Sequence, residues 1–286
     1  MKIISDKQCI IGEGPIWNEK KSLLYYTNTM GGNEICMIDV YTGDLSVRPT
    51  DIDCAAFAFD TNNRLIVSRK DGVFYLNDDN TVEPLYDTNR YNIKNCNDMK
   101  VGPDGCIYVG TQSSKRLGIS SKIDGKLYRI EKNGKVDILL DGLILSNGLE
   151  WSMDEKRFFH TDSDTGIIKE YDFDKLNGTL SYTGRSIKVD GVDGFTIDKN
   201  DNILATGWGY GRVSVIDTHT MEIVDYIEVP AQAPASCGFC GESMNKLAVV
   251  TATYGRNLDT DIYGGFTFLK EMEIGGRLPY LFGGKY

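Results

Sequence analysis

The sequence has little of what marks several common protein classes. It contains 7 prolines and 2 histidines in 286 residues, and no apolar run approaches the ~18 residues that a membrane-spanning helix needs. Two histidines give little material for a histidine-rich zinc centre or a Ser-His-Asp triad, and no G-x-S-x-G motif is present. No P-loop or dinucleotide-binding glycine motif opens a helix after a strand. These absences argue against histidine-dependent hydrolysis and nucleotide chemistry.

The cysteines do not form a disulfide framework. There are 7 of them, an odd number without framework spacing, and most lie inside apolar runs. Buried free thiols in a reducing compartment explain this pattern best. The N-terminal residues lack the apolar core of a signal peptide, so we expect a cytoplasmic protein. Cys237 and Cys240 match C-x-x-C, but one such pair is weak support for zinc or redox chemistry.

The charge balance limits the partners. The formal net charge is -10, which disfavours binding to a phosphate backbone or an anionic membrane. We therefore expect neither nucleic acid nor a membrane as a partner. The charge serves solubility on the simplest interpretation, and the other interpretation is that a few carboxylates converge on a cation.

A repeat runs through the whole chain. Six segments share an apolar residue, a polar turn and a strand-like run, and they recur every 42 to 50 residues. They start at Trp17, Phe59, Val101, Trp151, Ile197 and Phe239. A period in the forties made of short strands and turns is typical of propeller blades with about four strands each. The prediction is an all-β, six-bladed β-propeller that forms one domain over residues 1–286; a β-sandwich or two small barrels are the alternatives.

Several elements can be located within this frame. Residues 125–130 and 136–140 read as two strands joined by the hairpin turn signal Asn133-Gly134. Residues 251–261 read as a loop and 264–268 as a late strand. No long amphipathic helix is predicted. Because a propeller without closure would leave exposed strand edges, we expect the segment around residues 3–11 to pair with the C-terminal blade.

Four polar residues stand at the same place in four repeats. Glu13, Asn97, Asn147 and Asp193 each lie four residues before the residue that starts the repeated turn. Equivalent positions on different blades point to one axial spot, although Asn-Gly and Asp-Gly pairs can also simply form turns. Two carboxylates and two amides supply only oxygen, which suits Ca²⁺, Mg²⁺ or Mn²⁺ and is also accepted by Zn²⁺. We predict one divalent cation there, with water completing its shell.

The segments GEGPIW, NDMKVGPDG, SNGLEWS and VDGFTID, in this order and spacing, resemble the regucalcin (senescence marker protein) / gluconolactonase / luciferin-regenerating enzyme family. The resemblance spans essentially the whole chain. It implies a six-bladed propeller that holds one divalent cation and hydrolyses aldonolactones. Carried over by position, it implies that Glu13, Asn147 and Asp193 coordinate the metal. It also implies that Asn97 lies beside the metal and touches the substrate or a metal-bound water.

The substrate side departs from the family pattern. The family places an Arg two positions before the residue equivalent to Asn97, and here that position is Asn95. The following acid is kept as Asp98. The glutamate that the family places after the next strand falls near residues 112–114, where the sequence offers no acid. We assign Asn97, Asn95 and Asp98 to substrate binding, without assuming the sugar lactone that the family prefers.

These expectations combine into one reaction. The metal would polarise a lactone carbonyl and activate water, with Asp193 as the catalytic base and Asp98 as the nearest alternative base. Several side chains that fall just after inner-strand segments would set specificity or simply cover the core; they are Arg69, Lys70, Trp208, Tyr210 and Tyr254. The expected partner is a small-molecule lactone, and the chain is expected to be a monomer or weak dimer. The alternatives are a calcium-binding regulatory protein without lactonase activity and a hydrolase of another ester, such as a phosphotriester.

Overall fold

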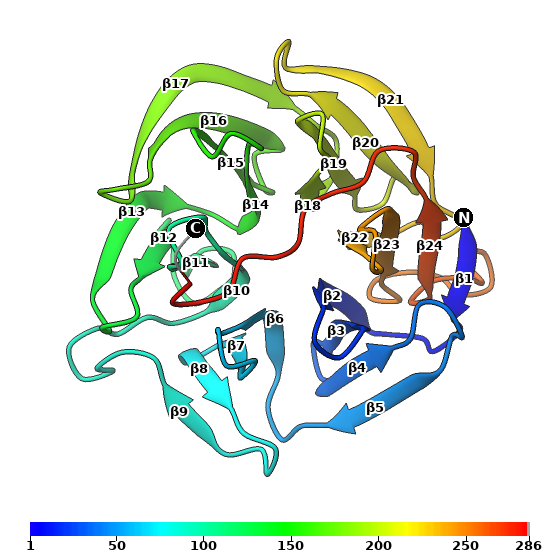
Figure 1. Ribbon diagram of the computed structural model, residues 1–286, viewed down its shortest axis with the longest axis horizontal. Coiled ribbons are helices and arrows are strands. Elements are labelled where there is room, and N and C mark those ends of the chain that lie inside the picture. The colour runs from blue at the N-terminus through cyan, green and yellow to red at the C-terminus, as the bar shows by residue number, and fades with distance from the viewer. Residues whose placement is uncertain (285–286) are drawn as a thin grey trace. The chain divides into compact units, whose positions relative to one another are not determined.

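Six four-stranded sheets follow one another along the chain in the computed structural model, which describes residues 1–284. These residues contain no helix. Five sheets are built from consecutive strands, and the sixth joins the first strand of the chain to its last three strands (Figure 1). The predicted fold class, an all-β, six-bladed β-propeller, is confirmed, and a β-sandwich or a pair of barrels is excluded.

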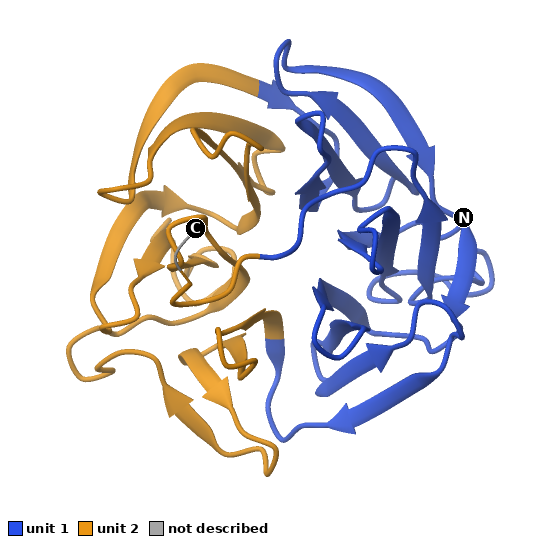
Figure 2. Ribbon diagram, viewed as in Figure 1, with its two compact units in different colours: residues 1–54, 187–279 blue, residues 55–186, 280–286 orange. Residues whose placement is uncertain are grey.

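The strands fall into two compact units, residues 1–54 with 187–279 and residues 55–186 with 280–286 (Figure 2). Two of the three boundaries lie inside strands, after Cys54 and after Ser186, and the third follows Pro279. The first unit holds three sheets: β2 (Ile11–Asn18), β3 (Leu23–Thr29), β4 (Glu34–Ile38) and β5 (Leu45–Pro49); β18 (Val192–Ile197), β19 (Asn202–Gly207), β20 (Arg212–Asp217) and β21 (Glu222–Glu228); β22 (Pro234–Cys240), β23 (Lys246–Thr251), β24 (Thr267–Glu271) and β1 (Lys2–Ser5).

The second unit holds the other three sheets: β6 (Cys54–Phe59), β7 (Leu65–Arg69), β8 (Gly72–Leu76) and β9 (Val82–Pro84); β10 (Cys96–Val101), β11 (Ile107–Thr111), β12 (Gly125–Ile130) and β13 (Val136–Leu143); β14 (Ser146–Trp151), β15 (Arg157–Asp162), β16 (Ile167–Asp174) and β17 (Thr179–Lys188). Its C-terminal segment returns to the first of these sheets, where Phe282 is buried and its N–H donates to the Phe59 carbonyl at 2.8 Å.

The burial of each strand follows from its place in the sheet. The first and second strands of a sheet are the more buried ones: every residue is buried in the first strands β14 and β22 and in the second strand β11. The fourth strands, such as β17, alternate between half-buried and exposed residues. Buried strands of this kind need residues that pack on both sides, and the apolar runs of the repeat supply them.

The N-terminal strand joins the last sheet, as predicted. β1 pairs antiparallel with β24, with Lys2 opposite Leu269 and Ile3 opposite Phe268 (Figure 1). The strand is shorter than the segment 3–11 that was expected, because residues 6–10 leave the sheet and Ile11 begins β2. β24 starts at Thr267, so the late strand begins three residues after the predicted position.

Candidate functional site

Glu13, Asn97, Asn147 and Asp193 each lie at a β-bulge near the start of the first strand of their sheets. The pairing register shifts between Glu13 and Ile16 in β2 and between Cys96 and Met99 in β10. It shifts again at Asn147 in β14 and after Val192 in β18. A bulge bends the strand and changes the direction of the side chains in it. The equivalence that the sequence suggested is therefore also an equivalence of backbone geometry.

The two remaining repeats carry alanine at this position. Ala235 lies in β22, where the register also shifts, and it is fully buried. Ala55 lies in β6 and is half-buried. Oxygen-bearing side chains thus occupy four of the six equivalent places.

In the second unit the structure brings two of these residues together. The Asn97 Nδ2 donates to Asn147 Oδ1 at 2.7 Å and to the Ser146 carbonyl at 2.9 Å. The Asn147 Nδ2 donates to Ser163 Oγ at 3.0 Å. The nitrogen of Asn147 is occupied by Ser163, so its oxygen is the atom presented toward Asn97. An amide oxygen has two lone pairs, and one of them is left for a cation or a water.

Buried groups hold this pair in place from behind. The Ser146 Oγ lies 2.7 Å from His160 Nε2, and both residues are buried. Burial lowers the pKa of the His160 imidazole to about 3, so the ring is neutral at neutral pH. The Ser68 Oγ of β7 donates to the Asn97 carbonyl at 2.8 Å. Hydrogen bonds therefore fix both Ser146, which accepts from the Asn97 side chain, and the Asn97 backbone, so the Asn97 side chain has few available positions.

Asn95 and Asp98 flank Asn97 and play different parts. Asn95 has a left-handed φ of 57°, which asparagine tolerates better than most residues. Its N–H donates to the Lys70 carbonyl at 2.6 Å, and its carbonyl accepts from the Gln112 N–H at 2.9 Å. Burial raises the pKa of the Asp98 carboxyl above its ordinary value, and the charge of Lys100 opposes this shift. Asp98 is consequently a better proton acceptor than an exposed aspartate, while its assignment and that of Asn95 to substrate binding stay predictions.

In the first unit the two carboxylates lie on strands that share a neighbour. β22 packs against both β2, which carries Glu13, and β18, which carries Asp193. Asp193 is 9% exposed and Glu13 is half-buried. The Thr206 Oγ1 donates to the Gly194 carbonyl at 2.7 Å and to the Ala235 carbonyl at 2.8 Å, which links β18 to β22 directly beside Asp193.

The donor set fits a hard cation by its chemistry. Among residues 1–284, no group of three or more His, Cys, Asp or Glu side chains is placed to hold a metal ion. The predicted set consists of two carboxylates and two amides. All of its donor atoms are oxygens, which hard divalent cations prefer as ligands. The C-x-x-C pair offers no alternative centre: the Cys237 thiol donates to the Leu204 carbonyl and the Cys240 thiol to the Lys246 carbonyl. Metal binding itself stays a prediction.

Several neighbours of the site were missed from the sequence. The Gln112 Nε2 donates to Asn97 Oδ1 at 3.3 Å, and Ser163 receives the Asn147 amide. An acid also lies near residues 112–114, where none was expected: Asp124 accepts from both the N–H and the hydroxyl of Ser114. No sequence signal marks these contacts, because each joins residues 10 or more positions apart across strands or loops.

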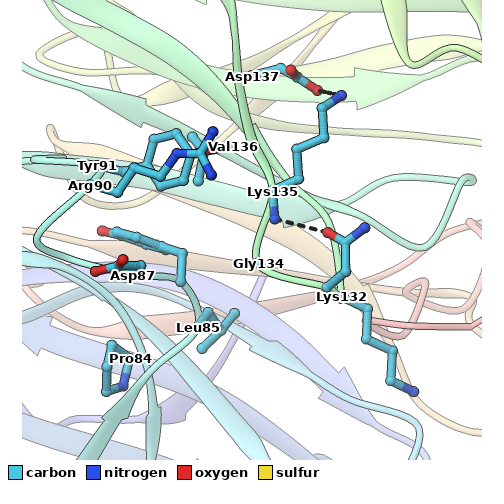
Figure 3. Close-up of a pocket in the computed structure, with 12 residues that line it drawn as sticks. Pro84, Leu85, Asp87, Arg90, Tyr91, Lys132, Gly134, Lys135, Val136 and Asp137 are labelled. Carbon is cyan, nitrogen blue, oxygen red and sulfur yellow. Dashed lines mark hydrogen bonds and ion pairs between the residues drawn. The ribbon is translucent and has the colours of Figure 1, made fainter.

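A cleft in the second unit lies on other strands and contains none of the predicted residues. It is lined by the segment after β9 and by the β12–β13 turn, including Arg90, Tyr91, Lys132 and Lys135 (Figure 3). The Arg90 guanidinium stacks on Tyr91 at 5.0 Å, and Lys135 pairs with Asp137 at 2.7 Å. None of the four residues at the shared register lines this cleft, so it is not part of the candidate site. Separately, no helix able to span a membrane is found within residues 1–284.

Comparison with known proteins finds relatives that match nearly the whole chain. A family model described as "SMP-30/Gluconolactonase/LRE-like region" matches residues 11–253. The Bacillus subtilis protein YvrE, whose name proposes that it is a sugar lactone lactonase, is 28% identical over 98% of this chain and 97% of its own. Regucalcin from Gallus gallus is 25% identical over 96% and 95% of the two chains. The crystal structure of the calcium-binding protein regucalcin from Agrobacterium tumefaciens superposes with a TM-score of 0.87 at 21% identity, covering 98% and 96%.

Proposed function

Because the chain belongs to the SMP-30/gluconolactonase/LRE-like family, we propose that it is a divalent-metal-dependent hydrolase of sugar lactones. The observation that carries the proposal is the shared register of Glu13, Asn97, Asn147 and Asp193, each at a bulge in the first strand of its sheet. A fold can host many activities, so the proposal depends on this set of side chains rather than on the propeller.

Glu13, Asn147 and Asp193 would hold the cation in this proposal. When bound there, a divalent cation would polarise the lactone carbonyl and lower the pKa of a water molecule. Asn147 is prepared for the role because Ser163 and Asn97 fix the orientation of its amide. The neutral His160 supports the same strand through Ser146 and adds no positive charge that would repel a cation.

Side chains of the protein would orient the substrate and transfer the protons. Asn97 would orient the substrate or the attacking water, since its own position is fixed from three sides. Asp193 would accept a proton as the water adds to the carbonyl carbon and would return it to the ring oxygen when the ring C–O bond breaks. The products are one hydroxyl and one carboxylic acid. Asp98 is the alternative base, because burial raises the pKa of its carboxyl.

The competing candidate is a calcium-binding protein without turnover. It is favoured by the description of the Agrobacterium regucalcin as a calcium-binding protein. An enzyme needs an open coordination position for its substrate, whereas a calcium buffer encloses its ion. Turnover and metal binding therefore have to be measured on the same preparation.

The test uses metal-stripped protein reloaded with Ca²⁺, Mg²⁺, Mn²⁺ or Zn²⁺ and a panel of aldonolactones in a pH-indicator assay. Asp193→Asn should lower kcat by at least about 100-fold, as expected for a lost base or ligand. The control is Asp172→Asn, which changes an exposed aspartate on β16 and should leave kcat within about twofold. Turnover without metal, or an unaffected Asp193→Asn variant, would contradict the proposal. Metal binding by calorimetry without turnover of any lactone would favour the calcium-binding alternative.

A further inference from the structure

An arginine and a tryptophan from two different loops of the first unit meet near Asp193. The Arg256 guanidinium lies over the Trp208 ring, 5.6 Å from its centre. Trp208 directly follows β19, and Arg256 lies in the long loop between β23 and β24. The pair is therefore built from two sheets, and neither residue was connected with the other from the sequence.

The pair lies next to the start of β18, the strand that carries Asp193. Val192 pairs with Gly207, the residue before Trp208, and the Trp208 N–H donates to the Gly191 carbonyl at 2.8 Å. Gly191 has a φ of +65°, and a Cβ there would collide with the Trp208 carbonyl. Trp208 is thus held against the segment that leads into Asp193.

The loop that carries Arg256 is also fixed. The Thr253 N–H donates to the Cys9 carbonyl at 3.1 Å, the Tyr254 N–H to the Ile10 carbonyl at 3.0 Å, and the Arg256 N–H to the Thr253 carbonyl at 3.0 Å. These bonds place the arginine before any ligand arrives, which lowers the entropy cost of recognition.

Within the described part of the chain, the charge of Arg256 has no counter-ion. Its Nε is shielded from solvent and makes no hydrogen bond, and within residues 1–284 no carboxylate forms an ion pair with its guanidinium. The chain has 41 acidic residues, and most of its other buried or half-buried arginines have such a partner, as Arg129 has in Asp104 at 2.8 Å. A buried N–H that lacks a hydrogen bond is costly, and a planar oxyanion is the group that suits an arginine without an acidic partner best.

We infer that Arg256 and Trp208 form a subsite for an oxyanion group of the substrate, so that the preferred lactone carries a carboxylate or phosphate in addition to its lactone ring. The inference rests on the proposed function, because it names the substrate class of the same site. The forked N–H groups of the Arg256 guanidinium would bind the oxyanion. Tyr210 and Tyr254, which are 51% and 53% exposed, lie in the same two loops as Trp208 and Arg256 and would flank the bound substrate.

The kinetic test compares a neutral lactone, D-glucono-1,5-lactone, with a carboxylated one, D-glucaro-1,4-lactone, and a phosphorylated one, 6-phospho-D-glucono-1,5-lactone. Arg256→Gln should lower kcat/KM for the preferred charged lactone by about 10- to 100-fold and leave the neutral lactone within about threefold. Arg256→Lys should recover only part of the loss, because it keeps the charge without the fork. The two charged lactones show which oxyanion is recognised. An equal loss on all three lactones, or a wild-type preference for the neutral one, would overturn the inference.

The matched control is Arg90→Gln. Arg90 also stacks on an aromatic ring, Tyr91, at 5.0 Å, but it lies in the segment after β9 and is exposed. This variant should leave all three kcat/KM values unchanged. A loss equal to that of Arg256→Gln would show a general effect of removing positive charge and would overturn the inference.

A binding test without turnover separates this inference from the proposed function. Trp17 and Trp151 are buried, so a ligand-induced change in intrinsic fluorescence reports chiefly on the half-exposed Trp208. D-Glucarate should give a saturable change that D-glucitol does not give and that Arg256→Gln weakens at least about 10-fold. If the wild type hydrolyses no lactone, the proposed function fails and this titration alone decides the subsite. No saturable change, or equal binding by wild type and Arg256→Gln, would overturn the subsite.

Discussion

Hydroxyl groups at one strand position link neighbouring sheets. The Thr27 Oγ1 donates to the Cys54 carbonyl at 2.9 Å, the Ser68 Oγ to the Asn97 carbonyl at 2.8 Å, and the Thr206 Oγ1 to the Ala235 carbonyl at 2.8 Å. In each case the donor lies near the end of a second strand and the acceptor lies in the first strand of the next sheet. The carbonyls of Asn97 and Ala235 lie at register shifts, where the ladder itself leaves groups unpaired, and these bonds satisfy them.

Thr206→Val should therefore be destabilising although the two side chains have nearly the same shape. Thr206 is fully buried, and valine would leave the carbonyls of Gly194 and Ala235 without this donor. We expect the free energy of unfolding in urea to fall by about 1–3 kcal/mol. Thr179→Val, at an exposed position of β17, is the control and should change it by less than about 0.5 kcal/mol. Equal effects of the two substitutions would contradict this explanation.

His160 should make stability depend on pH. Burial lowers the pKa of its imidazole to about 3, below the ordinary value of 6.5, so between these values the unfolded chain binds a proton that the folded chain does not. Stability should then fall as the pH falls below about 6.5, by at most about 1.4 kcal/mol per pH unit from this group. In urea unfolding from pH 7 to 4, His160→Gln should show a shallower decline than the wild type. Parallel curves for His160→Gln and the wild type would refute the assignment.

At the scale of elements, the strands could be predicted from the sequence, but the β-bulges could not. The repeat predicted the six first strands, because apolar runs and turn residues carry the signal for strand and hairpin. The turn at Asn133-Gly134 is confirmed: Gly134 has a φ of +82° and its N–H bonds to the Glu131 carbonyl. A register shift, in contrast, depends on the hydrogen-bond pairing between two strands, which the local sequence of either strand does not determine. For the same reason the contact between Asn97 and Asn147, residues 50 positions apart, could be expected from their common register but not specified atom by atom.

The bulge at Asp193 depends on close packing between two strands. A Cβ on Gly194 would collide with the Ser236 Oγ and would lie 2.8 Å from the Ser236 Cβ on β22. We expect Gly194→Ala to push the strands apart and to lower the free energy of unfolding by about 1–3 kcal/mol. Gly207→Ala is the control, because a Cβ there meets only ordinary contacts at 3.4 Å. Circular dichroism during thermal unfolding measures both, and a stable Gly194→Ala variant would show that the two strands can separate at no cost.

At the scale of the whole molecule, the first residues of the chain complete the sheet formed by the last strands. Ile4 of β1 is buried in the same apolar cluster as Phe268 and Leu269 of β24, whereas its neighbour Ile3 is 39% exposed. Ile4→Ala should lower the free energy of unfolding by about 2–4 kcal/mol, and Ile3→Ala should lower it by less than about 1 kcal/mol. Urea titration of the two variants measures the difference. Similar values would mean that β1 contributes little to the stability of the last sheet.

Alanine stands at two of the six equivalent positions, so the strands of a repeat form without an oxygen-bearing side chain there. Each repeat keeps its strands and turns whether alanine or a polar residue stands at this position, so a substitution here would change the predicted set of oxygen donors and leave the strands in place. Ala55 is half-buried, which leaves more room for a larger side chain than the fully buried Ala235. Ala55→Asp would raise the number of carboxylates at this register from two to three, and the charge of a ligand set is one of the properties that tune calcium affinity. A calorimetric comparison of the wild type and this variant would measure whether the added carboxylate changes the binding of Ca²⁺ or Mg²⁺.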